Sequence, residues 1–473
     1  MKTYQDLIAI GEDETKRKSF VMAVIRAHQD TGLYKTAVDA QEYYCHHNPT
    51  IMRYQKMIHN LAGQAIPDIL ASNSKIASNF FHFAVSQENQ YLLGNGATFQ
   101  NPETKDKLDP DFDYKLQKAG KEALIGGVAF GFFNLDKIDV FSIREFAPLY
   151  DEENGSLRAG VRFWQVSSDR PLRATLYEED GYTEYITHTD RHENKTMDIL
   201  HPKRPYKLVV RSTVIDGDQI VDGLNYNGFP IVPLYGNEAR QSELVGNRGT
   251  IDAFDLLNSN LVNGATDGNI IYWILENADG MNDEDDAKFL YKLRMQGVAH
   301  AEGDGVNGGA KATPHTVEAP YQGTVATIEK LEERLYQDFM AFNVKDLTGG
   351  QKTATEIKAA YQLLDSKVDA YEYEVIRFVR GILSLAGIDD SVSFTRSKII
   401  NNTEEIQAVL QAANYLDEET VTRKVLEVMG MSDSAKDVLR RMTESEASRY
   451  NYDDGDNGNI DQNNNLPPKT REE

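Results

Sequence analysis

The most regular hydrophobic pattern of the chain follows a short polar loop and ends at residue 387. Apolar residues recur there at alternating steps of four and three: Ile357, Tyr361, Leu364, Val368, Tyr371, Val375, Phe378, Ile382 and Leu385. This spacing places all of them on one face of an α-helix. Thr353 and Glu356 form a capping-box pattern at the start, and Gly387 suits the C′ position. The pattern predicts one helix about 50 Å long.

A second, shorter stripe precedes the polar loop. Its apolar residues are Ile328, Leu331, Leu335, Phe339 and Phe342, which again share a helix face. The loop itself consists of Lys345, Asp346, Leu347, Thr348, Gly349, Gly350, Gln351 and Lys352. The simplest interpretation is a helix–helix turn, but the loop is longer than such a turn needs. Because loops held by rigid helices often carry function, this loop is a candidate site.

The first half of the chain reads as helices followed by a sheet. Helices are predicted over residues 14–30, 34–47, 73–93 and 111–125. Beyond residue 128 the period changes to that of strands, with β-rich segments at 161–166, 174–177 and 182–187. Turn residues separate these segments, so an antiparallel sheet region is expected up to residue 234.

The second half alternates between helices and short strands. A helix is expected after Asn237, carrying Ile251, Phe254, Leu257, Leu261 and Ala265. A strand at 270–275 and short strands and loops at 298–320 follow, and a lone strand at 392–394 needs a partner elsewhere in the chain. Short helices are predicted at 404–416, 420–429 and 434–447, before a tail rich in Asn, Asp and Gly that should be disordered. The fold class is therefore α+β and mainly α-helical.

The composition narrows the class of protein. The chain has 473 residues, of which 40 % are hydrophobic, enough for a sizeable core divided among several subregions. Cys45 is the single cysteine, so no internal disulfide can form and a cytosolic environment is expected. The N-terminus lacks a secretory signal pattern, and the longest apolar run, 123–133, is too short to span a bilayer. A soluble intracellular protein is expected.

Acidity is the other strong feature of the composition. The formal net charge is −24, and acidic residues are spread along the chain. Such a protein is a poor candidate for ordinary binding to the phosphates of nucleic acids. The same charge would suit a protein that surrounds DNA without holding it.

Several motifs suggest metal or nucleotide binding and fail closer inspection. Cys45, His46 and His47, with His59 further along, lack a second ligand pair at zinc spacing. The glycine-rich segment 303–311 departs from the P-loop pattern, and segment 126–131 departs from the dinucleotide fingerprint. The acidic run at 283–286 could bind a hard cation, but a charge run is usually a solvated face.

One hydrolase hypothesis rests on the neighbouring carboxylates Glu178, Glu179 and Asp180. Adjacent residues at a strand turn make a poor active site, because a general acid needs a buried setting. We therefore expect no catalytic residues, no metal and no cofactor.

Four weak signatures in a fixed order make the chain resemble the portal proteins of tailed bacteriophages, in the siphophage branch. Residues 73–80, followed by Gln90-Tyr91-Leu92-Leu93-Gly94, resemble the family's N-terminal helix with its YxxG turn. Residues 229–238 resemble the strand exit into the first stem helix. Thr250-Ile251-Asp252-Ala253-Phe254-Asp255, with Ser259 and Asn263, resembles the IDAY…S…N stretch. Thr348-Gly349-Gly350 to Tyr361 resembles the tunnel loop and its helix, with looser spacing to Lys358 than usual.

The resemblance implies a portal fold with named regions. Mapped onto this chain, they are a wing at 1–235, a first stem helix at 236–265, a clip at 266–323, a second stem helix at 324–342, a tunnel loop at 343–354, a long helix returning to the wing at 355–400, a crown at 401–447 and a disordered acidic tail at 448–473. It further implies that Lys345 to Lys352 project into a DNA channel. The stem residues singled out by the resemblance are Ile251, Asp252, Phe254, Asp255, Ser259 and Asn263.

The resemblance also implies a function and partners. A dodecameric ring at one capsid vertex would let double-stranded DNA be packaged and ejected and would nucleate capsid assembly. Its partners would be the terminase large subunit, a head–tail adaptor, and the major capsid and scaffolding proteins, with no membrane and no enzymatic activity of its own. The location would be the virion, and the host cytoplasm during assembly. The alternative is another ring-forming neck or tail connector, although connectors are usually much shorter.

Overall fold

The structure, a computed structural model, describes most of the chain. The described residues are 2–59, 63–68, 71–189, 195–215, 218–267, 270–276, 311–317, 321–347, 354–397, 402–413 and 415–428, with 284, 288, 289, 291, 292, 438, 440 and 441. The chain divides into two compact units, Met1–Lys345 with Tyr361–Ser397, and Asp346–Ala360 with Lys398–Glu473. Helices and antiparallel strands occur together, as the predicted α+β class requires.

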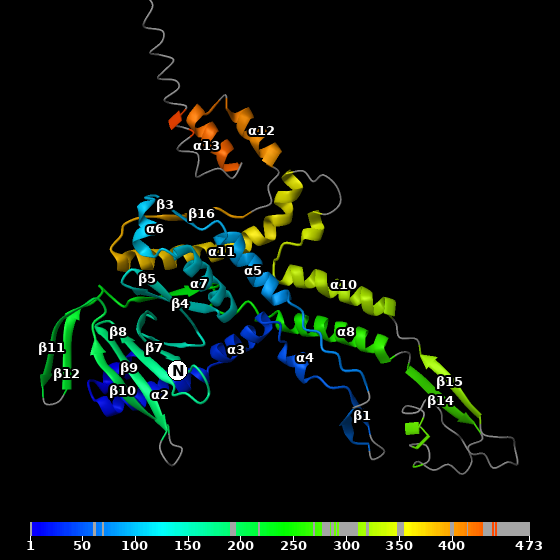
Figure 1. Cartoon of the computed structure of the whole chain (residues 1–473). Helices are drawn as coiled ribbons and strands as arrows, with labels where there is room; N and C mark the ends of the chain where they lie inside the picture. The colour runs from blue at the N-terminus through cyan, green and yellow to red at the C-terminus, as the bar shows by residue number, and fades with distance from the viewer. Residues whose placement is uncertain are drawn as a thin grey trace, which may run out of the picture. The chain divides into compact units, whose positions relative to one another are not determined.

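Helices form the N-terminal part of the first unit (Figure 1). They are α1 (Tyr4–Ile10), α2 (Glu14–Gln29), α3 (Gly32–Tyr44), α4 (Pro49–Arg53), α5 (Phe80–Leu93), α6 (Glu103–Leu108) and α7 (Phe112–Gly126). The side chains of Thr3, Asp13, Thr31 and Asn48 cap the helices that follow them. Each accepts a hydrogen bond from a backbone N–H that the helix start leaves without a partner. The predictions at 14–30 and 111–125 are confirmed.

Two antiparallel sheets fill the middle of the chain, as predicted. One has the order β10-β9-β8-β7-β6 and the other the order β13-β4-β5. Their strands are β4 (Val128–Asn134), β5 (Lys137–Ser142), β6 (Phe146–Tyr150), β7 (Leu157–Trp164), β8 (Arg173–Glu178), β9 (Gly181–Thr189), β10 (Lys195–Arg204) and β13 (Ile231–Tyr235). A separate hairpin pairs β11 (Leu208–Ile215) with β12 (Asp218–Leu224).

The five-stranded sheet is covered by α1 and α2. Phe20, Val21 and Val24 of α2 pack against Val161 and Leu176 of the sheet within one buried apolar cluster. Each strand contributes alternate residues to this cluster, such as Ala159, Val161 and Phe163 of β7, because successive side chains of a strand point to opposite faces. This cluster is one of the two main cores of the first unit.

Two long helices and a strand pair lie next to one another in the sequence order of the first unit (Figure 1). Helix α8 (Arg248–Asp267) leads to β14 (Ile270–Glu276), and β15 (Lys311–Val317) leads to α10 (Tyr321–Asp338). The strands pair antiparallel from Ile270 with Val317 to Glu276 with Lys311, and α8 packs along α10. We refer to α8 and α10 as the helical pair. The strand expected at 270–275 is confirmed.

The helix expected directly after Asn237 begins later, at Arg248. The side chain of Asn237 donates to the carbonyl of Gln241 at 2.8 Å and accepts from the Gln241 N–H at 3.2 Å. It also donates to Glu243 Oε1 at 2.9 Å. This local bonding offers the backbone an alternative to helix, which the hydrophobic pattern alone does not reveal.

Helix α11 (Ala354–Ala386) is the long helix that the heptad pattern predicts. The seven central residues of its stripe, from Tyr361 to Ile382, are at most 4 % exposed, whereas Ile357 and Leu385 at the ends are half-buried. Gly387 has φ +70° and ends the helix at the predicted place. The prediction is confirmed.

Glycines let α11 lie close to the three-stranded sheet. A Cβ at Gly131 of β4 would be 2.5 and 2.7 Å from ring atoms of Phe378. On the helix side, a Cβ at Gly381 would be 2.7 Å from Val232 of β13. Both distances are shorter than packed carbon atoms tolerate, so these two positions need the smallest residue. The contact forms the second main core.

The remaining short elements test the predictions of a lone strand at 392–394 and of short helices near the C-terminus. The lone strand at 392–394, β16 (Val392–Phe394), pairs antiparallel with β3 (Ala97–Phe99), almost three hundred residues earlier. In the second unit, α12 (Asn402–Ala412) and α13 (Glu418–Val428) correspond to two of the predicted short helices. The third, at 434–447, lies largely outside the described residues, and the predicted disordered tail lies wholly outside them. Helix α5 begins at Phe80 rather than at the predicted residue 73.

The buried stripe of α11 makes a direct stability prediction. Val375→Asp should destabilise the fold by more than about 3 kcal/mol, because it places a carboxylate among apolar side chains at a site that is 0 % exposed. Tyr373→Asp is the matched control, since Tyr373 lies on the same helix and is 70 % exposed. Urea unfolding followed by circular dichroism checks both, and equal midpoints for the two variants would contradict the packing of the stripe.

Candidate functional site

Helix α8 carries the six residues that the resemblance singles out. Ile251, Asp255 and Ser259 are buried, with exposed fractions of 1 to 3 %, whereas Asp252, Phe254 and Asn263 are half-buried. Four of them, Asp252, Asp255, Ser259 and Asn263, make hydrogen bonds to residues that precede α5. The structure thus brings these four together as one polar stripe of α8, which bonds to other segments of the same chain.

The stripe holds an extended segment, residues 74–78, along α8. The backbone N–H of Ser74 donates to Asn263 Oδ1 at 2.7 Å, that of Ile76 to Ser259 Oγ at 3.0 Å, and that of Ser78 to Asp255 Oδ1 at 3.0 Å. Every second residue of the segment meets every fourth residue of the helix. The match is geometric, because two extended residues advance about 6.6 Å and four helical residues about 6.0 Å. This segment therefore stays extended and delays the start of α5.

Asn48 ties a second element to the same stripe. Its amide donates to Asp252 Oδ1 at 2.9 Å and to Asp255 Oδ2 at 2.8 Å, while its oxygen caps α4. The Tyr43 hydroxyl donates to Asp252 Oδ1 at 2.6 Å. Burial raises the pKa of Asp255, against the opposing effect of the hydrogen bonds from Asn48 and Ser78. The sequence reasoning gave Asn48 no role and interpreted residues 73–80 as helix, although the steps of four between residues 255, 259 and 263 were a readable signal.

A buried lysine marks the base of the helical pair. Lys367 Nζ of α11 lies 2.7 Å from Glu88 Oε2 of α5 and 2.8 Å from Glu243 Oε2 of the segment before α8. It also donates to the carbonyl of Phe339, just beyond α10, at 3.1 Å. The side chains of Lys367, Glu88 and Glu243 are 14, 3 and 12 % exposed. One ammonium group therefore joins four segments that are distant in sequence, and we call this cluster the Lys367 junction.

The charges of the Lys367 junction are unequal. Two carboxylates face one ammonium, and these attractions outweigh the desolvation of Lys367, so its pKa is raised above the usual range. Glu88 behaves differently, because its complete burial raises its pKa to about 7 in spite of Lys367. The junction therefore requires Lys367 to be protonated and charged. Burial disfavours the charged, deprotonated form of Glu88.

Neighbouring polar contacts reinforce the Lys367 junction. Gln87 of α5 donates to the Phe342 carbonyl at 2.9 Å and accepts from the Phe342 N–H at 2.8 Å. The Phe342 ring stacks on Tyr361 with centroids 4.2 Å apart. These contacts fix the chain between the end of α10 and the polar loop. They define where that loop begins.

The structure describes only the start of the candidate loop. Residues 344–347 form a 3₁₀ turn, Val344–Leu347, and the Lys345 ammonium lies 2.8 Å from Glu332 Oε1 of α10. This contact raises the pKa of Lys345. The rest of the loop, Thr348, Gly349, Gly350, Gln351 and Lys352, lies outside the described residues. Asp346 and Leu347 belong to the backbone turn.

The alternatives raised by the sequence find ordinary structural roles. Glu178 pairs with Arg17 at 2.9 Å and with Lys203 at 3.2 Å, and Glu179 pairs with Arg158 at 2.6 Å. Among the residues that the structure describes, no group of His, Cys, Asp or Glu could hold a metal ion, and no helix is both long and apolar enough to cross a membrane. The acidic run at 283–286 lies mostly outside those residues.

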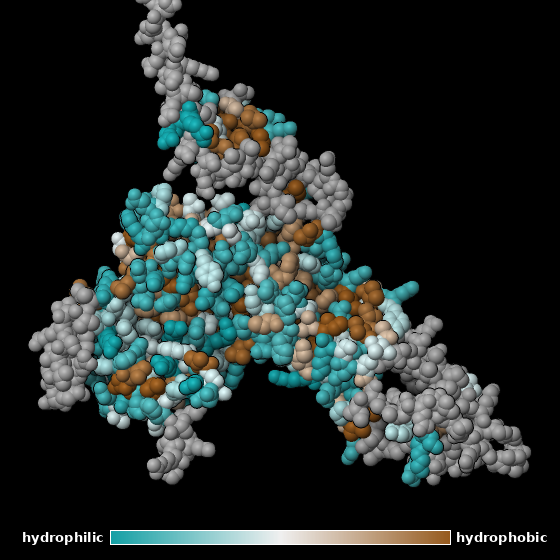
Figure 2. All heavy atoms as spheres, in the orientation of Figure 1, coloured by the Kyte–Doolittle hydropathy of each residue, from teal (hydrophilic) through white to brown (hydrophobic). Residues whose placement is uncertain are grey.

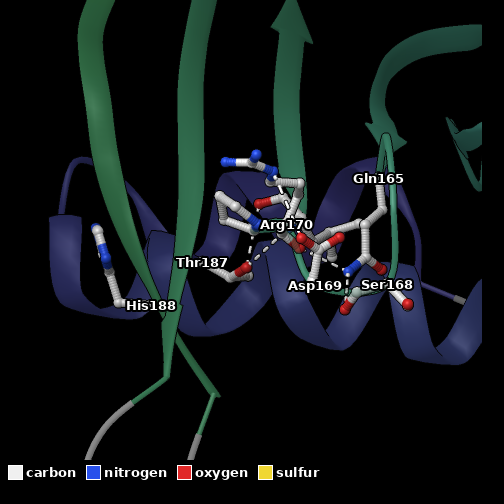
Figure 3. A pocket seen from close by; sticks show the side chains of 8 residues that line it. Gln165, Ser168, Asp169, Arg170, Thr187 and His188 are labelled. Carbon is white, nitrogen blue, oxygen red and sulfur yellow. Dashed lines mark hydrogen bonds and ion pairs between the residues drawn. The ribbon is translucent and has the colours of Figure 1, made fainter.

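A shallow cavity of about 310 Å³ lies at the turn between β7 and β8 (Figure 3). Its polar groups already bond to one another. Gln165 donates to the Arg170 carbonyl at 2.7 Å, and the Leu172 N–H donates to Thr187 Oγ1 at 2.8 Å. The close-up shows these side chains bonded across the turn, with His188 apart from them. The cavity is a product of the turn and offers no convergent set of groups for a substrate.

Comparison with known proteins assigns the chain to a family. The model of the family described as phage portal protein, SPP1 Gp6-like, matches residues 27–448, so the chain belongs to this family. The portal protein of Bacillus phage SPP1 is 22 % identical over 484 residues, covering 96 % of this chain and 91 % of that protein. The portal protein of Clostridium phage phiCD119 is 22 % identical over 436 residues, covering 85 % of this chain and 91 % of that protein. The resemblance read from the sequence is confirmed.

Among solved structures, a chain from the neck of a native GTA particle, computed with C12 symmetry, is similar to this one. The identity is 12 % and the TM-score 0.36, with 74 % of this chain and 90 % of that chain covered. A TM-score this low supports no conclusion about the fold.

The Lys367 junction yields a prediction of very different magnitude for two of its members. Lys367→Met should cost about 3–5 kcal/mol of stability, because it leaves two buried carboxylates without a counter-charge. Glu88→Gln should be nearly neutral at pH 8, because Lys367 keeps Glu243 as its partner. Urea unfolding of both variants checks this, and a larger loss in Glu88→Gln than in Lys367→Met would contradict it.

The same junction predicts a pH dependence. The pKa of Glu88 is raised from 4.5 to about 7 in the folded state, so its stabilising contribution is complete below about pH 4.5 and is lost as the pH rises through 7. The free energy of unfolding of the wild type should fall over this window by more than that of Glu88→Gln. Identical slopes of stability against pH in the two proteins would show that Glu88 has an ordinary pKa.

The polar stripe of α8 makes a local prediction. Ser259→Ala should cost about 1 kcal/mol and speed hydrogen exchange at Ile76, whose N–H loses its acceptor. Asn258→Ala is the control, because Asn258 is on the same helix but bonds only to the Phe254 carbonyl. Exchange followed by mass spectrometry over residues 72–79 distinguishes the two, and unchanged exchange in Ser259→Ala would exclude the hydrogen bond.

Proposed function

We propose that this chain is a portal protein. Copies of it form a ring around a channel at one vertex of a phage capsid, and double-stranded DNA enters and leaves through that channel. The observation that carries the proposal is the match to the portal family over residues 27–448. Two relatives that share most of their length with this chain are themselves described as portal proteins.

In this proposal, the regions of the portal fold follow the order expected from the resemblance. The helical pair α8 and α10 forms the stem, and the segment between the two helices, including β14 and β15, forms the clip. The N-terminal helices, the sheets and most of α11 form the wing, and α12 and α13 belong to the crown. The arrangement is supported by α8 packing along α10 with a strand pair between them in sequence.

The proposed mechanism is mechanical and electrostatic, without chemistry by this chain. An acidic wall offers few deep binding wells to a passing duplex, because its net charge repels phosphate. Lys345 and Lys352 would touch phosphates only briefly. Lys345 is already paired with Glu332 at the surface, and exposed pairs exchange partners at little cost. The energy for DNA movement would come from a terminase large subunit, with a head–tail adaptor binding later.

The remaining partners follow from the same proposal. The ring would be a dodecamer built into the virion, and it would meet the major capsid and scaffolding proteins in the host cytoplasm during assembly. A ring buries surfaces that a single subunit exposes. Assembly is therefore the first property to measure.

The first prediction concerns assembly. Negative-stain electron microscopy of the purified chain should show rings with a central hole, and native mass measurement should give an integral multiple of one subunit. A strictly monomeric protein at micromolar concentration, also in the presence of scaffolding protein, would contradict the proposal.

The second prediction concerns the loop. Lys345→Ala combined with Lys352→Ala should leave rings intact while lowering the amount of DNA packaged or retained, because the two cations nearest the duplex are removed. Lys330→Ala, which removes an exposed lysine from α10, is the control. Normal packaging by the double variant would remove these lysines from the mechanism.

A further inference from the structure

A β-hairpin follows α4 in the first unit, and its first strand, β1, is labelled in Figure 1. It starts where α4 ends, pairs β1 (Met57–His59) with β2 (Ala65–Pro67), and returns through the extended segment that lies on α8. We call residues 53–79 the β-arm. The backbone N–H groups of Ser74, Ile76 and Ser78 bond to α8 and hold the C-terminal end of the arm on that helix.

The described strands of the β-arm are apolar on both faces, and each face carries an exposed residue. Ile58 is paired with Ile66 on one face, and Met57 with Pro67 on the other. Met57 is 49 % exposed and Ile66 is 39 % exposed. Figure 2 shows apolar atoms at the surface over β1. A two-stranded hairpin is marginally stable in water by itself, so a surface that covered this one would stabilise it.

The charge of the β-arm is opposite to that of the rest of the chain. It contains Arg53, Lys56 and Lys75 against the single acidic residue Asp68, whereas the whole chain has a net charge of −24. The surface of another copy is therefore attractive to the arm electrostatically. This complementarity favours a second copy of the chain as the partner of the arm, because the arm does not reach an acidic face of its own subunit.

The helical pair supplies a surface of matching chemistry. Val325, Glu329 and Glu333 of α10 follow one another at steps of four and are exposed, so they form an apolar and acidic stripe along one flank of the helix. The opposite flank of α10 carries Leu335, which is fully buried. We call these three residues the α10 stripe.

The β-arm and α10 lie on opposite sides of α8. Thr250 and Gly264 of α8 contact Asp338 and Tyr321 of α10. At 100° per residue, these positions are about half a turn away from Ser259, the centre of the stripe that binds the arm. A subunit therefore presents the arm on one side and the α10 stripe on the other. Different surfaces on opposite sides are what a head-to-tail ring contact requires.

We propose that the β-arm docks onto a second copy of this chain, with its apolar strands and basic residues against the α10 stripe of that copy. The inference rests on the proposed ring and names one of its contacts. It assigns Met57 and Ile66 to the apolar centre of the contact and Arg53 to its charged edge.

The first test removes the apolar centre. Met57→Glu combined with Ile66→Glu should lower the assembled fraction, measured by analytical ultracentrifugation, by about tenfold or more, while the melting temperature of the dissociated subunit stays unchanged. Val166→Glu is the matched control, since Val166 is apolar and 84 % exposed on another turn. Normal rings in the double variant would overturn the proposal. Absence of rings in the wild type would instead overturn the proposed function together with it.

The second test addresses the identity of the partner surface. In a Cys45→Ser background, which removes the only native thiol, Met57→Cys with Val325→Cys should form disulfide-linked dimers and larger ladders in the assembled protein. Arg53→Glu and Glu333→Lys should each weaken assembly and restore it when combined. Assembled rings that yield no inter-subunit disulfide, or charge reversals that fail to compensate, would show that the arm binds elsewhere or serves another virion protein, and would overturn the proposal.

Discussion

A single buried ammonium group ties together the segments that define this fold. Lys367 reaches Glu88 of α5, Glu243 before α8 and the carbonyl of Phe339 after α10, all at 2.7–3.1 Å. Burying a charge is costly unless partners surround it, and here two carboxylates and a carbonyl do so. The orientations of α8 and α10 therefore depend on the polar contacts of Lys367, which have defined partners and directions that apolar packing lacks.

The apolar stripe of α11 and the polar stripe of α8 stabilise the first unit in different ways. The apolar stripe of α11 supplies burial, and glycines such as Gly131 allow its aromatic residues to approach the sheet closely. The polar stripe of α8 supplies register, because its hydrogen bonds fix which residue of segment 74–78 meets which turn of the helix. Burial is tolerant of small shifts, whereas hydrogen bonds with defined partners are not. The combination gives a buried core together with a fixed register between α8 and segment 74–78.

The same features bear on the proposed ring. A conduit for DNA needs a subunit whose helices keep a constant angle while the duplex moves past them, and the Lys367 junction holds together the segments at their base. The β-arm and the α10 stripe would carry that rigidity from one copy to the next. Since the β-arm bonds to α8 and α10 packs along α8, a change in the orientation of one subunit would alter both of its proposed contacts with its neighbours.

The amino-acid sequence by itself determined the elements that depend on local period. The α11 stripe, its stop at Gly387, the strands of the central sheet and the strand at 270–275 all follow from spacing, because one buried face imposes a period of 3.6 or 2. The ordered signatures also revealed the portal family, which the comparison confirmed. Only the tertiary structure decided what depends on distant partners. Segment 73–79 is extended rather than helical because Asp255, Ser259 and Asn263 bond its backbone, and Arg248 rather than Asn237 begins α8 because Asn237 folds the preceding turn. The role of Lys367 was equally hidden, since a lysine on a helix reads as a surface residue until two carboxylates from elsewhere in the chain are placed beside it.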